Sequence, residues 1–345
     1  MKKEQYILYI VVACFVASVM SACRLDRGLI KESTDTHVKF VRYDRVVNDY
    51  VNTGNVALWQ RMNMEFPRET RALIEDVLKI GPVDKEGIED SLRTFYTDPT
   101  LTQLRMDVAR RFEDMSIYEA DINAAFTRLQ SECPTFVVPK VYTQNSAFNQ
   151  SIVVGDSLIG VSLDKYLGAD YPAYRKYFYE NQRVTMESTR IVQDCLIFYL
   201  NQQYPFLDKG RKHTLGEWMV QQGRIGWVVS QLTCKKPIDV AACQPATKRW
   251  YTMHEQDVWT SLVNPTLWNS TDSVTLHSIM MTNDAQPYFK DPHSRGVGLW
   301  ISMRMIESYM EHHPHVSIDS LLHLKDSHNY YKNASIEVSS QFLVE

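Results

Sequence analysis

Cys23 is the residue whose neighbours most clearly specify a chemistry. Lys2 and Lys3 precede an apolar stretch at 6–19, and Met20-Ser21-Ala22-Cys23 follows that stretch. A positive start, a short apolar stretch and small residues before the cleavage point are typical of an exported protein, and the cysteine makes the pattern that of a lipoprotein signal. The chemistry requires a thiol, because a diacylglycerol alkylates the sulfur, the chain is cut before Cys23, and the new amine is acylated.

A plain secretory signal and an uncleaved membrane anchor are the two alternatives to lipidation. The apolar stretch is shorter than the roughly 20 residues that span a bilayer, which counts against a permanent helix. At about 0.8 kcal/mol per buried CH₂ one acyl chain binds only marginally, whereas two or three hold a protein at the membrane. We therefore expect a lipoprotein signal peptide at 1–22, a lipidated tether at 23–36, and one globular domain at 37–345 that stays in water.

The remaining cysteines suit an oxidising compartment outside the cytoplasm. Cys234 and Cys243 bracket a short loop, CKKPIDVAAC, which permits either a disulfide or two free thiols. The disulfide would contribute about 2–3 kcal/mol on the chain-entropy model. Cys195 falls on the apolar side of a predicted helix with no histidine nearby in sequence, which favours packing over a role as nucleophile.

Composition bounds the remaining possibilities. The chain has 345 residues, of which 44% are hydrophobic and 23% charged, so it can bury a sizeable core without a metal or a dense disulfide net. Its net charge is -4, and no cluster of Lys and Arg is interleaved with aromatic residues. These features argue against nucleic acid as a partner.

The stretch 150–200 organises the predicted fold. Apolar runs at 151–154 and 158–162 flank Gly155-Asp156-Ser157, which indicates two strands joined by a hairpin turn. Residues 190–200 repeat apolar side chains at helical spacing, so we expect a central helix packed on these strands. Residues 134–143 are rich in β-branched and aromatic residues and predict a third strand beside the hairpin.

The rest of the chain carries mostly helical spacing. Residues 37–50 fit a strand that passes into a short helix, and 203–213 fit a loop. Gly223 and Gly226 should interrupt a weakly helical segment. The other predicted helical segments are 57–130, 215–229, 247–262 and 296–310. The fold class is therefore α+β, mostly helical, with a small β-sheet packed on a central helix.

Three stretches carry a resemblance to a known family: FVRYD near the start of the domain, GDSLIGVSLDKYLGADYPAYRKYF in its middle, and SRGVGLWISMRMIESYMEHHPHVSIDSLLHL near its end. From about Val38 to the C-terminus the chain resembles the gliding-motility lipoprotein GldB family of the Bacteroidetes. It departs from the family pattern at Ser302, where a glycine is usual, which argues against very close packing of that helix. The family is in turn similar to zincin-type peptidases, and the resemblance implies a zincin-like domain.

The zincin relationship makes a test possible on the residues. A zincin holds zinc with two histidines at i and i+4 of its central helix, and the glutamate beside the first acts as base. No histidine occurs between Val38 and Lys212, and the central helix offers only Asp194, which Arg190 can pair at i,i+4 spacing. The dipeptide His254-Glu255 lacks a second histidine one turn later and is expected on a polar helix face.

Two further patterns could suggest ligands. His312-His313-Pro314-His315 could bind a transition metal, but histidines near a helix C-terminus are favoured by the helix dipole without one. Gly296-Val297-Gly298 lacks the preceding strand and third glycine of a phosphate loop, and no Gly-x-Ser-x-Gly occurs. The sequence therefore predicts no catalytic residue, no cofactor site and no metal site.

Two functions remain. The first is a non-catalytic pseudo-peptidase scaffold, anchored to the membrane through lipid on Cys23, that presents a groove between the sheet edge and the central helix to a protein partner. The resemblance implies that such partners belong to the motility or secretion machinery of the cell envelope. The alternative is a hydrolase with an unconventional active site. The aromatic stretch Tyr166–Tyr179 is either a partner surface or a loop packed over the core.

The location follows from the lipoprotein signal. Residues Arg24–Asp26 contain no acidic run of the kind associated with surface export. We therefore expect a lipid-anchored protein of the cell envelope, held at the outer membrane and facing the periplasm.

Overall fold

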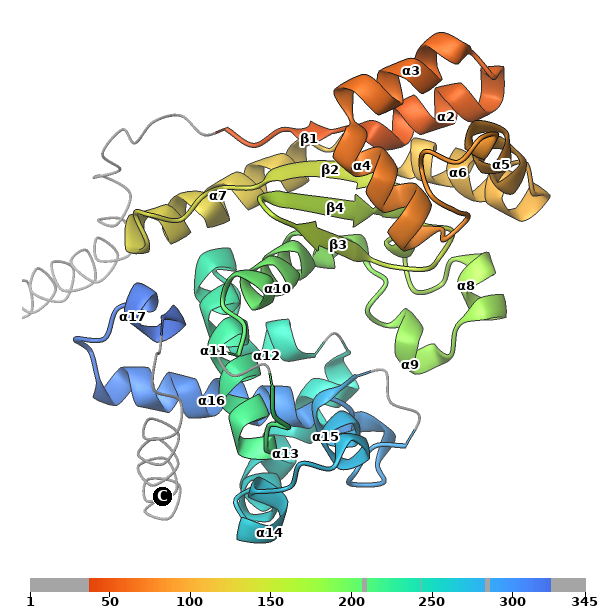
Figure 1. The fold of residues 1–345 in the computed structure, drawn as a ribbon. Coiled ribbons are helices and arrows are strands. Elements are labelled where there is room, and N and C mark those ends of the chain that lie inside the picture. Colours follow the sequence, from red (N-terminus) through yellow and green to blue (C-terminus); the bar gives the residue numbers. More distant parts are fainter. Residues whose placement is uncertain (1–36, 207–209, 243, 283–285, 324–345) are drawn as a thin grey trace, which may run out of the picture. The chain divides into compact units, whose positions relative to one another are not determined.

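A computed structural model describes residues 37–206, 210–242, 244–282 and 286–323 (Figure 1). Contacts divide the chain into residues 1–37 and 38–345, and every described helix and strand belongs to the second unit. The predicted signal peptide, Cys23 and Cys243 lie outside the described residues.

A four-stranded sheet lies at the centre of the first half of this unit. Its strands are β1 (Phe40–Val41), β2 (Lys140–Gln144), β3 (Ile152–Gly155) and β4 (Leu158–Ser162), in the order β1-β2-β4-β3. β1 and β4 both pair parallel with β2, while β3 pairs antiparallel with β4. The predicted hairpin and third strand are confirmed, and the α+β class with them.

The two faces of the sheet alternate along each strand. On β2, Val141 packs into the core on the α10 side of the sheet and Tyr142 into the core on the opposite side. Gly160 of β4 lies in register with Tyr142, and a Cβ atom at position 160 would be 2.4 Å from the tyrosine ring. Only glycine leaves room for this ring.

Helices that follow β1 cover one face of the sheet (Figure 1). They begin with α2, which starts directly after β1 and buries Tyr43, Val47 and Tyr50. The prediction of a strand passing into a short helix is therefore confirmed. The set comprises α2 (Tyr43–Thr53), α3 (Val56–Glu65), α4 (Pro67–Arg71), the π-helix η2 (Ala72–Val77) and α5 (Ile88–Tyr96).

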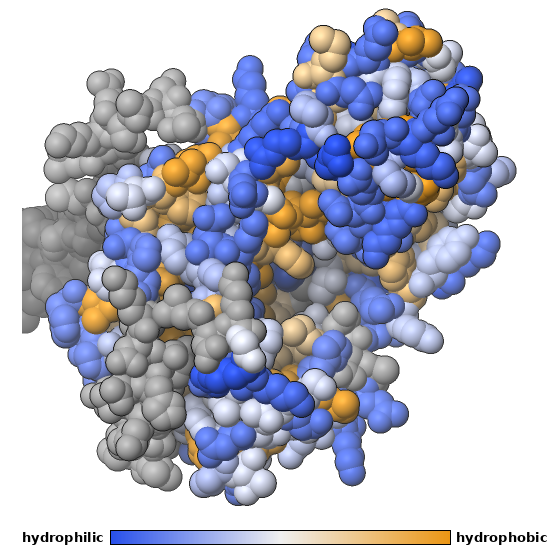
Figure 2. Space-filling model, in the orientation of Figure 1, coloured by the Kyte–Doolittle hydropathy of each residue, from blue (hydrophilic) through white to orange (hydrophobic). Residues whose placement is uncertain are grey.

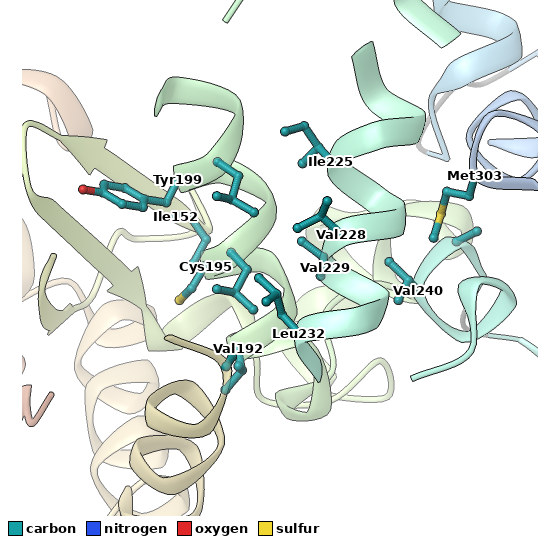
Figure 3. Close-up of a cluster of buried hydrophobic side chains, with 14 of the residues drawn as sticks. Ile152, Val192, Cys195, Tyr199, Ile225, Val228, Val229, Leu232, Val240 and Met303 are labelled. Carbon is teal, nitrogen blue, oxygen red and sulfur yellow. The ribbon is translucent and has the colours of Figure 1, made fainter. Parts of the chain in front are cut away.

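The opposite face packs on α7 (Ser116–Glu132) and on the central helix α10 (Ile191–Gln203). Figure 3 shows the side chains that join this layer, with Ile152 of β3 beside Cys195 and Tyr199 of α10. The predicted packing of a central helix on the strands is confirmed. α6 (Pro99–Arg111) precedes α7 and contributes Val108 to the same core.

Short elements connect the sheet to α10, and a helical part follows it. The connecting elements are η3 (Leu163–Lys165), α8 (Pro172–Tyr177), α9 (Glu180–Arg183) and η4 (Ser188–Arg190). The helical part comprises α11 (Leu215–Thr233), α12 (Pro237–Ala241), α13 (Pro245–Leu262), α14 (Pro265–Trp268), α15 (Ser273–Met280), η5 (Pro292–Ser294), α16 (Val297–His312) and α17 (Ile318–Leu322).

The expected interruption of α11 at Gly223 and Gly226 is wrong, because the helix runs unbroken through both residues. The glycines instead leave room for α16 to pack closely against α11. A Cβ atom at position 223 would lie 2.5 Å from the carbonyl oxygen of Ser302, and one at 226 would lie 2.9 Å from the sulfur of Met303. The expectation that Ser302 prevents close packing of its helix is wrong for the same reason, since Gly223 supplies the missing space.

α11 begins with a capping box. The Thr214 hydroxyl accepts a hydrogen bond from the Glu217 amide at 3.3 Å, and the Glu217 carboxylate accepts one from the Thr214 amide at 2.9 Å. Arg211 also binds this carboxylate, with N–O distances of 2.8 and 2.5 Å. These bonds satisfy backbone donors that a helix start leaves free and fix where the longest described helix begins.

Candidate functional site at helix α10 and the sheet edge

The first turns of α10 hold the acid that the sequence singled out. Arg190 Nη2 lies 2.9 Å from Asp194 Oδ1, so the predicted i,i+4 pair is confirmed. The Tyr166 hydroxyl donates to Asp194 Oδ2 at 3.0 Å. Burial raises the pKa of Tyr166, and the nearby Asp194 charge raises it further, so the phenol keeps the proton that it donates. Each oxygen of this carboxylate therefore contacts a neighbouring side chain.

Gln193, the residue before Asp194, also makes a structural contact. Gln193 is buried, and its Nε2 donates to the Val240 carbonyl oxygen at 3.0 Å, which ties α10 to α12. Lys235 donates to the Thr189 carbonyl oxygen at 3.3 Å, at the start of α10. Burial lowers the pKa of Lys235, and the nearby Arg190 lowers it further.

A zinc site of the zincin kind does not fit α10. Such a site needs imidazoles at two positions four residues apart on one face, with an acid after the first. Around Asp194 those positions hold Gln193 and Ile197, which are an amide bonded elsewhere and an aliphatic side chain. Across the described residues, no three side chains of His, Cys, Asp or Glu converge in a way that could hold a metal ion.

The histidines that the sequence singled out make local contacts. His254 stacks on Trp250 with ring centroids 4.4 Å apart, and the neighbouring Glu255 pairs with Arg304 at 2.9 Å. His312 and His313 each place Nδ1 2.8 Å from the carbonyl oxygen four residues earlier in α16. These contacts belong to helix surfaces and helix ends, as the sequence indicated for both groups.

The aromatic stretch Tyr166–Tyr179 divides into a packed part and an exposed part. Tyr166 and Tyr174 are fully buried, and the Tyr174 hydroxyl donates to the Asp164 carbonyl oxygen at 2.5 Å. Tyr177 and Tyr179 are 49% and 77% exposed. The interpretation as a loop packed over the core therefore holds for the first part, and only the end of the stretch offers aromatic surface.

A buried polar cluster at the carboxyl ends of β2 and β4 escaped the sequence reasoning. Asp164 accepts hydrogen bonds from the Ser146 amide at 2.6 Å, the Ser146 hydroxyl at 3.0 Å and the Phe148 amide at 2.7 Å. Burial raises the pKa of Asp164, although these hydrogen bonds oppose the rise. The cluster holds Ala147 and Phe148 at positive φ, and so fixes the turn that leads into β3.

One signal could have located this cluster. Parallel strands place their carboxyl ends at the same edge of a sheet, and Asp164 comes two residues after β4 while Ser146 comes two residues after β2. The parallel pairing of these strands was not evident from their own residues. The side chains in the cluster bond one another and nearby backbone, so we assign them a structural role.

β3 forms one edge of the sheet, beside α10. Val153 and Val154 are only partly buried, and Phe198 on α10 is 44% exposed. Figure 2 shows apolar side chains gathered over β3, where the surface is hollowed. No described strand pairs with the outer side of β3. A strand edge of this kind with exposed apolar side chains nearby is the arrangement to which extended peptides bind in proteins.

The cysteines differ in their surroundings. Cys195 is fully buried in the core, and burial raises the pKa of its thiol well above the ordinary value, which suits packing and not nucleophilic attack. Cys234 is exposed at the C-terminal end of α11. Because Cys243 lies outside the described residues, the Cys234–Cys243 disulfide stays a prediction.

A family model described as gliding motility protein GldB, which is a lipoprotein family, matches residues 28–336. No curated protein and no solved structure matches the chain. None of the described helices is both long and apolar enough to cross a bilayer.

Proposed function

Because this chain belongs to the gliding motility protein GldB family, we propose that it is a non-catalytic scaffold that binds an extended segment of a protein partner along the edge of β3. The family points to gliding motility, and the partners are then components of the motility or secretion machinery. The scaffold is held at the membrane by lipid on Cys23, at the outer membrane and facing the periplasm.

The observation that carries this proposal is the edge of β3 beside α10, which no described strand covers. Main-chain groups on a strand edge give affinity for an extended peptide, and neighbouring side-chain pockets give specificity. The partly buried Val154 lies on the α10 side of the sheet, and α10 itself carries the exposed ring of Phe198. A partner segment with apolar residues at alternate positions would cover both.

The state of Asp194 favours a scaffold over a hydrolase. A general base must reach a water molecule or substrate proton with a free oxygen. Asp194 is buried, with one oxygen paired with Arg190 and the other bonded to Tyr166, so both oxygens are already held in contacts within the fold. The zinc positions of a zincin are filled by residues that cannot serve as its ligands.

Photo-crosslinking in intact cells tests this function. Phe198→p-benzoylphenylalanine places a photoreactive aromatic group on the exposed surface of α10, the helix that packs on β3, with little change in shape. The matched control is the same substitution at Tyr288, because that ring is 43% exposed against 44% for Phe198 and lies in a different part of the chain. We expect a discrete covalent adduct with an envelope protein from position 198 only.

Two outcomes would contradict the scaffold. Equal adducts from both positions would show that contact at β3 is not selective. Peptide hydrolysis by the purified lipoprotein, lost in Asp194→Asn, would favour the hydrolase instead.

A further inference from the structure

The backbone of β3 has two residues whose polar groups face away from the sheet. The Ser162 amide donates to the Ser151 carbonyl oxygen at 2.9 Å, which makes these two residues a hydrogen-bonded pair. Hydrogen-bonded pairs alternate along an antiparallel ladder, so the N–H and C=O groups of Ile152 and Val154 point away from β4. In the described part of the chain no strand pairs with that side of β3.

The end of the sequence contains a segment that matches this edge. Residues 334–339 read Ala-Ser-Ile-Glu-Val-Ser, a strict alternation of apolar and polar residues with β-branched side chains at Ile336 and Val338. Such alternation is typical of a strand with one buried face. The segment lies outside the described residues.

The described chain ends close enough for this segment to reach β3. His323 packs its ring on Tyr204, with centroids 5.1 Å apart, and Tyr204 directly follows α10. Tyr199, about 7.5 Å earlier along the same helix, lies beside Ser157 in the β3–β4 turn. The ten residues 324–333 can span up to about 33 Å. This reach is several times the distance of about 7.5 Å that separates Tyr204 from Tyr199 along α10.

The direction of approach sets the orientation of the added strand. A chain that arrives at the turn meets the Gly155 end of β3 first and then runs towards Ile152, antiparallel to β3. In that orientation Ile336 can face Val154 and Val338 can face Ile152, so that each pair exchanges two backbone hydrogen bonds.

On both faces of the sheet, the side chains of β3 are compatible with those that this register would place beside them. Ile152 and Val154 pack on the α10 side of the sheet, so Ile336 and Val338 would extend the apolar surface on that side. Glu337 would fall on the opposite face, opposite Val153. Arg68 lies on that face, since a Cβ atom at Gly155 would be 3.9 Å from its Nη2. The single charge of the segment therefore meets an opposite charge.

We propose that residues 334–339 bind along β3 of the same chain as a fifth, antiparallel strand, with Ile336 opposite Val154 and Val338 opposite Ile152. The segment covers the edge that the proposed function assigns to a partner, so it acts as an internal competitor that the partner must displace. Covering an open edge in this way also protects it from unwanted pairing with other chains.

Hydrogen exchange on the purified full-length lipoprotein tests the added strand. In the full chain we expect the amides of Ile152 and Val154 to exchange about tenfold more slowly, or slower still, than in a chain that ends at Asn333. The double variant Ile336→Lys, Val338→Lys should exchange like the truncated chain. Its matched control, Ser335→Lys with Ser339→Lys, adds the same charge on the other face and should keep the protection.

Equal exchange at these two amides in all four proteins would overturn the proposal. Unchanged exchange in α16 shows in each case that the fold is intact, because Met303 and Ile306 are buried core residues of that helix. Oxidation of a Val154→Cys, Ile336→Cys variant, which places the two thiols at directly opposite positions of the proposed register, distinguishes one chain from two. A bond between these two positions within one chain supports the proposal, whereas a covalent dimer linked through them would assign the segment to a second copy and overturn it.

The crosslinker at position 198 separates this inference from the proposed function. If both hold, truncation at Asn333 increases the yield of the partner adduct. If only the scaffold function holds, the adduct forms equally with and without residues 334–345, and the internal strand is refuted. If the amides are protected but no partner adduct forms in either chain, the internal strand stands and the scaffold function fails.

Discussion

The contact between α11 and α16 offers the most quantitative test of how this fold is held together. At Gly223 the two helices approach so closely that a Cβ atom would lie 2.5 Å from the carbonyl oxygen and 2.7 Å from the carbonyl carbon of Ser302. Both are backbone atoms, so no side-chain rotation can relieve the overlap. Gly223→Ala therefore forces α16 to move away from α11 along a contact that is buried on both sides.

The magnitude follows from two opposing contributions. Overpacking of a filled core costs about 1–3 kcal/mol, and backbone overlap places this site at the upper end. Replacing glycine by alanine inside a helix returns about 1 kcal/mol. We expect Gly223→Ala to lower the free energy of unfolding by about 2 kcal/mol.

Gly226→Ala is the matched control in the same helix. There the Cβ atom would meet the sulfur of Met303 at 2.9 Å and its Cγ at 3.0 Å, both in a side chain with three rotatable bonds. The side chain can move aside, so the gain in helix propensity offsets the cost and the stability should stay within about 0.5 kcal/mol of wild type.

Denaturant unfolding of the lipid-free domain, followed by circular dichroism, measures both variants. Ser302→Gly adds a further check, because it removes the serine Cβ at 2.8 Å but leaves the carbonyl oxygen at 2.5 Å from the new methyl group. It should not restore the stability of Gly223→Ala. The reasoning would be refuted if Gly223→Ala were as stable as wild type, or if Gly226→Ala were the more damaging change.

Three further predictions follow from the capping box, the lipid anchor and the metal question. Burial alone would raise the pKa of Glu217, but hydrogen bonds from Arg211 and the Thr214 amide outweigh it, so the pKa is lowered. A lowered carboxyl pKa stabilises the native state above the unfolded pKa, and this contribution disappears as pH falls through the folded pKa. Glu217→Gln should therefore cost about 1–2 kcal/mol at pH 7 and clearly less at pH 3, as measured by denaturant unfolding at each pH; an equal loss at both would count against the ionic contribution. Cys23→Ala should leave the membrane fraction while the domain stays folded, and its retention in that fraction would disprove lipid anchoring. Protein purified without chelators or a metal-binding tag should contain no stoichiometric zinc, and a chelator should not change its melting temperature. A content of one zinc per chain would favour the hydrolase function over the scaffold.

The parts of the fold that the sequence predicted are those with local periodicity. The hairpin at 151–162 has alternating apolar residues around a Gly-Asp turn, and α10 has an apolar stripe of helical period. In both cases the pattern that forms the element is also the pattern that buries it, so residues close in sequence suffice. The pair of Arg190 and Asp194 was predictable for the same reason, because its spacing is fixed within one helix.

The features that the sequence did not predict depend on residues distant along the chain. Gly223 looks like a helix breaker until Ser302 is placed against it, 79 positions later. The buried Asp164 could be located only by knowing that β2 and β4 run parallel. Local propensity penalises a mid-helix glycine by about 1 kcal/mol, and the tertiary contact that it permits outweighs this cost.

The same distinction explains why function is harder to predict here than fold. The zincin relationship expected from the family resemblance directs attention to α10. The polar side chains there make structural contacts, because Asp194 binds Arg190 and Tyr166, and Gln193 binds the backbone of α12. Within the described residues, the outer backbone groups of β3 have no strand partner. This edge carries no residue signature, because backbone N–H and C=O groups such as those of Ile152 and Val154 occur in nearly every amino acid. Side-chain motifs therefore cannot reveal a site of this kind. The edge of β3 can be recognised only when the strand order and the hydrogen-bond pairing of the sheet are known. A segment that could pair with this edge is then expected to alternate apolar and polar residues.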